Sequence, residues 1–198
     1  MRARSPASEA SAWALAARAL GRLASTAIVC AMIAAAPPAH ALEATAPAIK
    51  AAFLYKFGFF VEWPQTSFIS SDSPINLCVV GDDSFGALLD DTVKGKKIGS
   101  RDIAVRRLSA VSRNSGCHIL YVPGDADTHA IETLGTLKGS DVLTVTDTTP
   151  RGDDSGIISF VMKDNRVRFD IDDAAAASGG LVIDSRLLNL ALAVKPRH

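Results

Sequence analysis

The chain has 198 residues, and its 21 Lys and Arg balance its 21 Asp and Glu, so the formal net charge is zero. Such a balance leaves no basic footprint of the kind that nucleic-acid binding requires, and we expect no nucleic-acid partner. Residues 42–198 are enough for one ordinary domain with its own hydrophobic core.

The first 41 residues are typical of a cleavable signal peptide. A stretch with several arginines precedes an uncharged apolar run from Leu23 to Ala36. This run is shorter than the about 20 residues that a membrane anchor needs. Two prolines and the small-residue pattern of Ala39–Ala41 follow, which predicts cleavage after Ala41. We therefore expect residues 1–41 to be removed and a domain of residues 42–198 to work outside the cytoplasm.

Two cysteines, Cys78 and Cys117, remain once Cys30 leaves with the signal peptide. An even number in an oxidising compartment favours a disulfide. Closing a loop of about 40 residues contributes roughly 3 to 4 kcal/mol in the chain-entropy model. The alternative is a pair of buried free thiols.

The mature chain begins with an aromatic-rich segment. Apolar residues from Pro47 to Glu62 recur at three- and four-residue spacing, which predicts an amphipathic helix that ends before Pro64. The elements that we expect next are a strand Ile75–Val80, a helix from Phe85 to about Asp91, a hairpin of Lys96–Ile98 and Ile103–Leu108, a strand Cys117–Val122, a helix from Ala126 to about Leu137, and a strand Asp141–Thr146. Alternating strands and helices predict a parallel sheet.

The last third changes character. Strands Gly156–Lys163 and Arg166–Ile171 flank Asp164 and Asn165, residues that tolerate a left-handed turn, so they predict a hairpin. A short helix from Asp172 through Ala177 and a final helix Asp184–Ala193 follow. The fold class is therefore α/β: a single domain with a mixed, mostly parallel sheet flanked by helices and a C-terminal antiparallel hairpin.

Residues that carry chemistry are few. The mature chain has three histidines and no G-x-S-x-G motif. Cys117 and His118 are neighbours on an expected strand, so their side chains point to opposite faces and cannot form a catalytic pair. The Gly81–Gly86 segment lacks the Lys and the Ser or Thr of a phosphate loop, and its Asp and Ser residues are helix-cap candidates. We expect no catalytic residue, no metal site and no cofactor.

Several blocks of the sequence resemble the YfiR family of exported bacterial proteins. The run Ile49–Pro64, IKAAFLYKFGFFVEWP, is similar to the opening signature of that family. The blocks that agree later are LCVVGDDSFGALLD, CHILYV, VLTVTD, ISFVMKDNRVRFDID and DSRLLNLA. The resemblance implies a periplasmic repressor that binds the periplasmic sensor region of an inner-membrane diguanylate cyclase and so lowers cyclic di-GMP. It also implies release by an outer-membrane lipoprotein, and Cys78 and Cys117 match one cysteine pair of the family.

The partner-binding residues that we expect are Phe57, Phe60 and Trp63 of the aromatic helix and Arg186 of the final helix. The same aromatic face is also suited to contact between two copies of the chain. The alternative function is a periplasmic small-ligand-binding accessory protein, because crevices at the strand ends of α/β domains serve as pockets.

Overall fold

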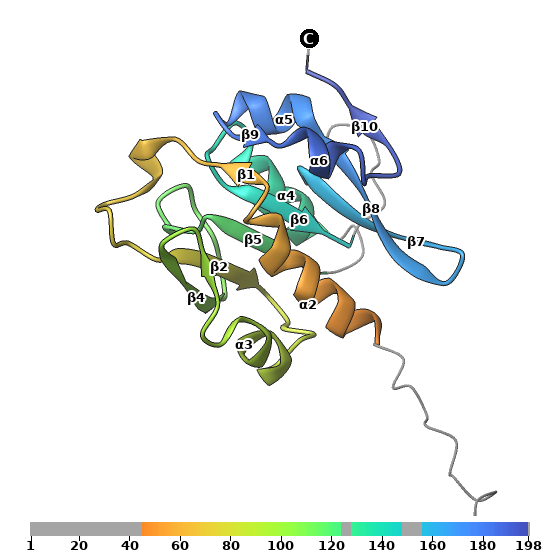
Figure 1. Cartoon of the computed structure of the whole chain (residues 1–198), viewed down its shortest axis with the longest axis horizontal. Helices are drawn as coiled ribbons and strands as arrows, with labels where there is room; N and C mark the ends of the chain where they lie inside the picture. Colours follow the sequence, from red (N-terminus) through yellow and green to blue (C-terminus); the bar gives the residue numbers. More distant parts are fainter. Residues whose placement is uncertain (1–44, 124–127, 148–155, 198) are drawn as a thin grey trace, which may run out of the picture. The chain divides into compact units, whose positions relative to one another are not determined.

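An eight-stranded sheet forms the centre of the structure, a computed structural model that describes residues 45–123, 128–147 and 156–197 (Figure 1). The strand order is β10-β8-β7-β6-β5-β2-β4-β3. Strand bounds are β2 (Ile75–Val80), β3 (Lys97–Ile98), β4 (Arg101–Leu108), β5 (Ile119–Val122), β6 (Leu143–Thr146), β7 (Ile158–Lys163), β8 (Arg166–Asp172) and β10 (Val194–Lys195). Among the described strands of this sheet, only the β3–β4 and β7–β8 pairs are antiparallel. The α/β fold with a mostly parallel sheet is therefore confirmed.

Alternation along the central strands creates two separate cores. On β2, Leu77 and Val79 face one core, whereas Cys78 and Val80 face the other. Helices α2 (Ala46–Phe57) and α3 (Ala87–Val93) cover the first face, and α4 (Thr128–Leu137) covers the second (Figure 1). A parallel sheet buried on both faces explains why its strands are apolar throughout.

The aromatic segment forms a shorter helix than the sequence predicts. Helix α2 ends at Phe57, and the chain turns through Gly58 into a two-residue strand, β1 (Val61–Glu62). A Cβ atom at Gly58 would lie 2.3 Å from Ile98 Cδ1, so glycine permits a close approach to β3 there. Strand β1 pairs with β9 (Val182–Ile183) in a second, antiparallel sheet. The prediction of a helix continuing to Glu62 was wrong, because pairing between distant segments outweighs the helical spacing.

The final helix is also shorter than predicted. Helix α6 spans Ser185–Leu188, with the Asp184 carboxylate accepting a hydrogen bond from the Arg186 amide at its start. The chain then adds β10 beside β8, and the Ile171 amide donates to the Ala193 carbonyl. The expected helix Asp184–Ala193 was wrong, since backbone pairing with the open edge of β8 replaces its second half.

Other local predictions were closer. Asp164 and Asn165 have φ values of 50° and 57°, which confirms the left-handed turn of the β7–β8 hairpin. Helix α5 (Asp173–Ser178) starts as expected, with Asp172 accepting from the Ala175 amide. Asp83 does not cap α3; its carboxylate accepts from the Phe85 amide in the turn before that helix.

The signal peptide predicted for residues 1–41 and the start of the helix predicted at Ala126 lie outside the described residues. Among the residues described, no helix is both long and apolar enough to cross a membrane.

Candidate functional site

A disulfide joins Cys78 of β2 to Cys117, which precedes β5, as the sequence predicts. The two Cα atoms are 5.8 Å apart, and the residues are 0% and 7% exposed. Both lie in the core under α4, with Leu134 and Leu137. The bridge thus fastens neighbouring parallel strands within a buried layer.

His118 lies on the opposite face of the sheet from Cys117, where its ring is held from two sides. Its Nδ1 accepts from the Asn76 amide at 3.0 Å, so Nε2 carries the proton and donates to the Ser67 carbonyl at 3.1 Å. The ring stacks on Phe68 with 4.6 Å between centroids. Burial lowers the pKa of His118 below its ordinary value. With both nitrogens engaged and the ring neutral, His118 acts as a structural group and has no nitrogen left for catalysis.

Trp63 also contacts the His118 ring, and we call the rings of Trp63, Phe68 and His118 the ring cluster. Its Nε1 donates to the His118 carbonyl at 3.3 Å, and its ring meets the His118 ring edge-on. Arg101 lies 3.7 Å above the Phe68 ring and donates to the Ser73 carbonyl. These contacts hold the segment from Trp63 to Ser73 against the sheet. The Trp63 side chain therefore has a structural role in the fold.

Of the residues expected at a partner interface, Phe57 is in the core. It is 1% exposed and packs against Phe53, Phe160 and Phe169, so its assignment to the surface was wrong. The helical spacing hid this, because aromatic residues lie on two faces of α2 and the pattern does not identify which of those faces is buried.

Phe60 and Arg186, by contrast, meet at the surface. The Arg186 guanidinium lies 5.5 Å from the centroid of the half-buried Phe60 ring. Its side chain is 73% exposed and pairs with Asp184 at 2.7 Å. Hydrogen bonds from Arg186 lower the pKa of Asp184 to about 2, so this pair stays charged. Glu62 and Val182, which face each other across the β1–β9 ladder, are both exposed beside it. We call Phe60, Glu62, Val182 and Arg186 the β1–β9 surface.

A polar cluster that the sequence analysis missed lies at the carboxyl ends of β5 and β6. Tyr121 donates to Asp147 Oδ2 at 2.5 Å, and Lys50 Nζ lies 2.9 Å from the same oxygen. Asp147 Oδ1 is buried without a partner among the described residues. The sequence signal was present, since Asp147 directly follows a buried parallel strand, where α/β folds place polar groups that serve a site.

This cluster is suited to binding rather than proton transfer. Burial, the largest cause, and the hydrogen bond to Asp147, the second, raise the pKa of Tyr121 well above its usual range. The phenol therefore remains protonated. A cavity of about 430 Å³ adjoins it, lined by Lys50, Asp147, Phe160, Val161 and Met162. The Lys50–Asp147 pair also ties the first half of α2 to the end of β6. Within the part of the chain that the structure describes, no group of three or more His, Cys, Asp or Glu side chains is arranged to hold a metal ion.

Comparison with known families decides which group of proteins this fold represents. A family model described as YfiR/HmsC-like matches residues 47–192, which is nearly the whole described domain. The chain belongs to the YfiR/HmsC-like family. No curated protein matches the sequence.

The region matched by the family model includes both cysteines of the disulfide, His118 and Trp63 of the ring cluster, and the β1–β9 surface. This family is regulatory and non-catalytic. Membership in it indicates that the protein is a periplasmic regulator of cyclic di-GMP signalling. A buried disulfide agrees with function in an oxidising compartment.

Proposed function

We propose that this YfiR/HmsC-like protein is a periplasmic repressor that binds the periplasmic sensor region of an inner-membrane diguanylate cyclase and thereby lowers cyclic di-GMP. The observation that carries the proposal is the family match over residues 47–192. Repression requires that the protein bind the inactive conformation of the sensor more tightly than the active one, since a ligand shifts an equilibrium only by its differential affinity.

The surface that supports this role best is the β1–β9 surface. Val182 is 47% exposed, and the charged head of Arg186 is open to solvent above the Phe60 ring. Aromatic and arginine side chains dominate the binding energy of protein interfaces, particularly where an apolar neighbour excludes water. The backbone beneath is fixed by the β1–β9 ladder and by the Asp184 amide donating to the Phe60 carbonyl at 2.8 Å. The interface would therefore form on a preorganised patch.

The cellular test is deletion of the gene, which should raise cyclic di-GMP, followed by complementation. The wild-type gene should restore the low level, whereas Val182→Asp combined with Arg186→Glu should not. Ile69→Asp is the matched control, because Ile69 is a fully exposed apolar residue that is not part of this surface, and it should complement like the wild type. An unchanged cyclic di-GMP level on deletion, with the cyclase expressed, would contradict the proposed function.

Binding to the purified sensor region separates the interface from the function. Loss of a central interface residue costs about 2 kcal/mol or more, so the double variant should bind about 30-fold more weakly. Normal binding by this variant would move the interface elsewhere on the domain and leave the repressor role standing. The outer-membrane lipoprotein that the family resemblance implies should compete for the protein in the same assay if it acts by releasing the cyclase.

A further inference from the structure

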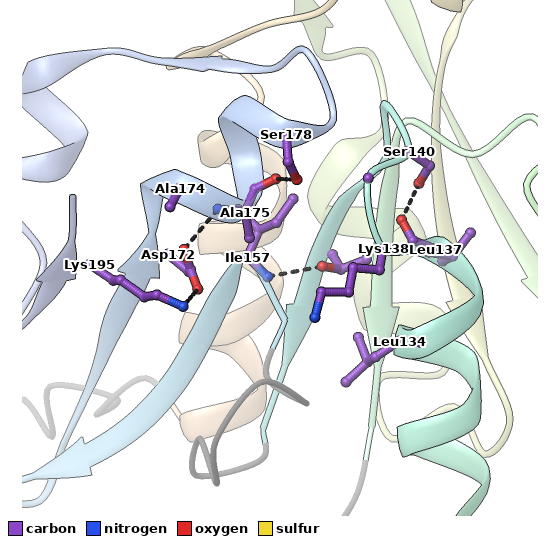
Figure 2. A pocket seen from close by; sticks show the side chains of 13 residues that line it. Leu134, Leu137, Lys138, Ser140, Ile157, Asp172, Ala174, Ala175, Ser178 and Lys195 are labelled. Atoms are coloured by element: carbon purple, nitrogen blue, oxygen red, sulfur yellow. Dashed lines mark hydrogen bonds and ion pairs between the residues drawn. The ribbon is translucent and has the colours of Figure 1, made fainter. Parts of the chain in front are cut away.

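A second cavity lies between the C-terminal half of α4 and helix α5, away from the Lys50–Asp147 cluster (Figure 2). Its volume is about 290 Å³, near the lower end of the range for small-molecule pockets, roughly 300 to 1,000 Å³. Apolar side chains from α4, from α5 and from the residue before β7 form much of its lining: Leu134, Leu137, Ile157, Ala174 and Ala175. A site of this size and lining suits a small molecule with an apolar body.

The hydroxyl groups of the lining are already engaged within the protein. Ser140 donates to the Leu137 carbonyl at 2.6 Å, and Ser178 donates to the Ala175 carbonyl at 2.7 Å. Thr144 Oγ1 accepts from the Ile157 amide at 2.9 Å. The strongest donors that a ligand would meet are therefore the two lysine ammonium groups of the lining, Lys138 and Lys195.

The charges of the lining do not cancel. Asp172 caps α5 with one carboxylate oxygen and pairs with Lys195 at 3.1 Å through the other. The contacts of Lys138 with described residues involve its backbone, and its Nζ forms no hydrogen bond or ion pair with any of them. In Figure 2 the Lys138 side chain extends from the end of α4 into the cavity, while Lys195 reaches Asp172 from the opposite side. The ammonium group of Lys138, an exposed residue at the end of α4, thus lacks a counter-charge in the described lining.

We propose that this cavity binds a small organic monoanion, an aliphatic or aromatic carboxylate, with the carboxylate at Lys138 and the apolar body against α4 and α5. A charge-assisted hydrogen bond to Lys138 supplies specificity for the anion, and burial of the apolar body supplies the remaining affinity. Inorganic phosphate satisfies only the first requirement. The site is independent of which protein the β1–β9 surface binds, and its test does not require that partner.

The test is a titration of the purified, signal-cleaved protein with hexanoate and benzoate, followed by amide chemical shifts in ¹H–¹⁵N spectra. Hexanamide and benzamide are the uncharged controls, and inorganic phosphate tests the anion alone. Saturable shifts should concentrate at residues 134–140 and 172–178. The carboxylates should bind at least about tenfold more tightly than the amides, since hydrogen bonds to charged groups contribute about 1.5 to 3 kcal/mol.

Two variants connect the signal to the cavity. Lys138→Gln should weaken carboxylate binding about tenfold, whereas Lys94→Gln, at an exposed lysine after α3, should leave it unchanged. Gly135→Leu places a side chain in the lining where a Cβ atom meets nothing within 4 Å, and it should abolish binding. If this variant does not fold, Lys138→Gln decides. Carboxylates that bind no better than amides or phosphate, or that bind Lys138→Gln normally, would overturn the proposal.

Discussion

Removal of the Cys78–Cys117 bridge should destabilise the domain by an amount that the structure allows us to calculate. The cysteines are 39 positions apart, and both side chains are buried. For a closed loop of this length the chain-entropy model gives about 13 cal/mol/K, or about 4 kcal/mol at 25 °C. Cys78→Ala combined with Cys117→Ala removes the cross-link and little volume, so this loss should dominate.

The assay is urea unfolding of the wild type and the double variant, each with and without a phosphine reductant. With a slope of roughly 2 kcal/mol/M, the midpoint should fall by about 2 M urea. The melting temperature should fall by roughly 8 to 16 °C, because a domain of this size shifts about 2 to 4 °C per kcal/mol. Reductant should lower the stability of the wild type once the bridge is accessible and leave the double variant unchanged. A loss below about 1 kcal/mol in the double variant would refute the loop-closure argument.

Three further outcomes follow from single positions. Burial lowers the folded-state pKa of His118, so the unfolded chain binds more protons than the folded chain below about pH 6.5. Stability should therefore fall as the pH drops from 7 to 5, by at most about 1.4 kcal/mol per pH unit for this group. His118→Gln should flatten this pH dependence in urea unfolding. Gly179→Ala should destabilise the fold strongly by thermal unfolding, since the new Cβ would lie 2.0 Å from the Ser140 carbonyl oxygen; an unchanged melting temperature would contradict the close approach. Tyr121→Phe should cost about 1.5 kcal/mol in urea unfolding through the lost hydrogen bond to Asp147, and a neutral result would show that the phenol contributes nothing net.

The strands were predictable from the sequence because both faces of the sheet are buried. Ile75–Val80 is an apolar run bounded by turn residues, and its predicted limits match β2 in the structure. The hairpin turn at Asp164 and Asn165 was equally clear, since few residues tolerate a positive φ. Local chemistry was sufficient in both cases.

The segments that failed depend on partners far away in the chain. Val61 has the spacing of a helix, yet it pairs with Ile183, more than 120 positions later. The residues after Leu188 continue a helical pattern, but Leu192 and Ala193 form backbone hydrogen bonds with the open edge of β8, and β10 follows them. The same reason hid the Lys50–Asp147 contact, which joins residues 97 positions apart. Sequence periodicity reports a local preference, and tertiary pairing overrides it.

The disulfide and the β1–β9 surface lie on different sides of the sheet, yet a short path of contacts joins them. Cys117 directly precedes His118. Two residues before Cys78, the Asn76 amide donates to the His118 ring, and the Asn76 carbonyl accepts from the His118 amide. The His118 carbonyl accepts from Trp63, which directly follows β1. Loss of the bridge removes a restraint at Cys78 and Cys117, which lie within two residues of Asn76 and His118 in the chain. We therefore expect reduction of the bridge to weaken partner binding at the β1–β9 surface through a shift of β1, a prediction that partner affinity measured before and after reduction will test.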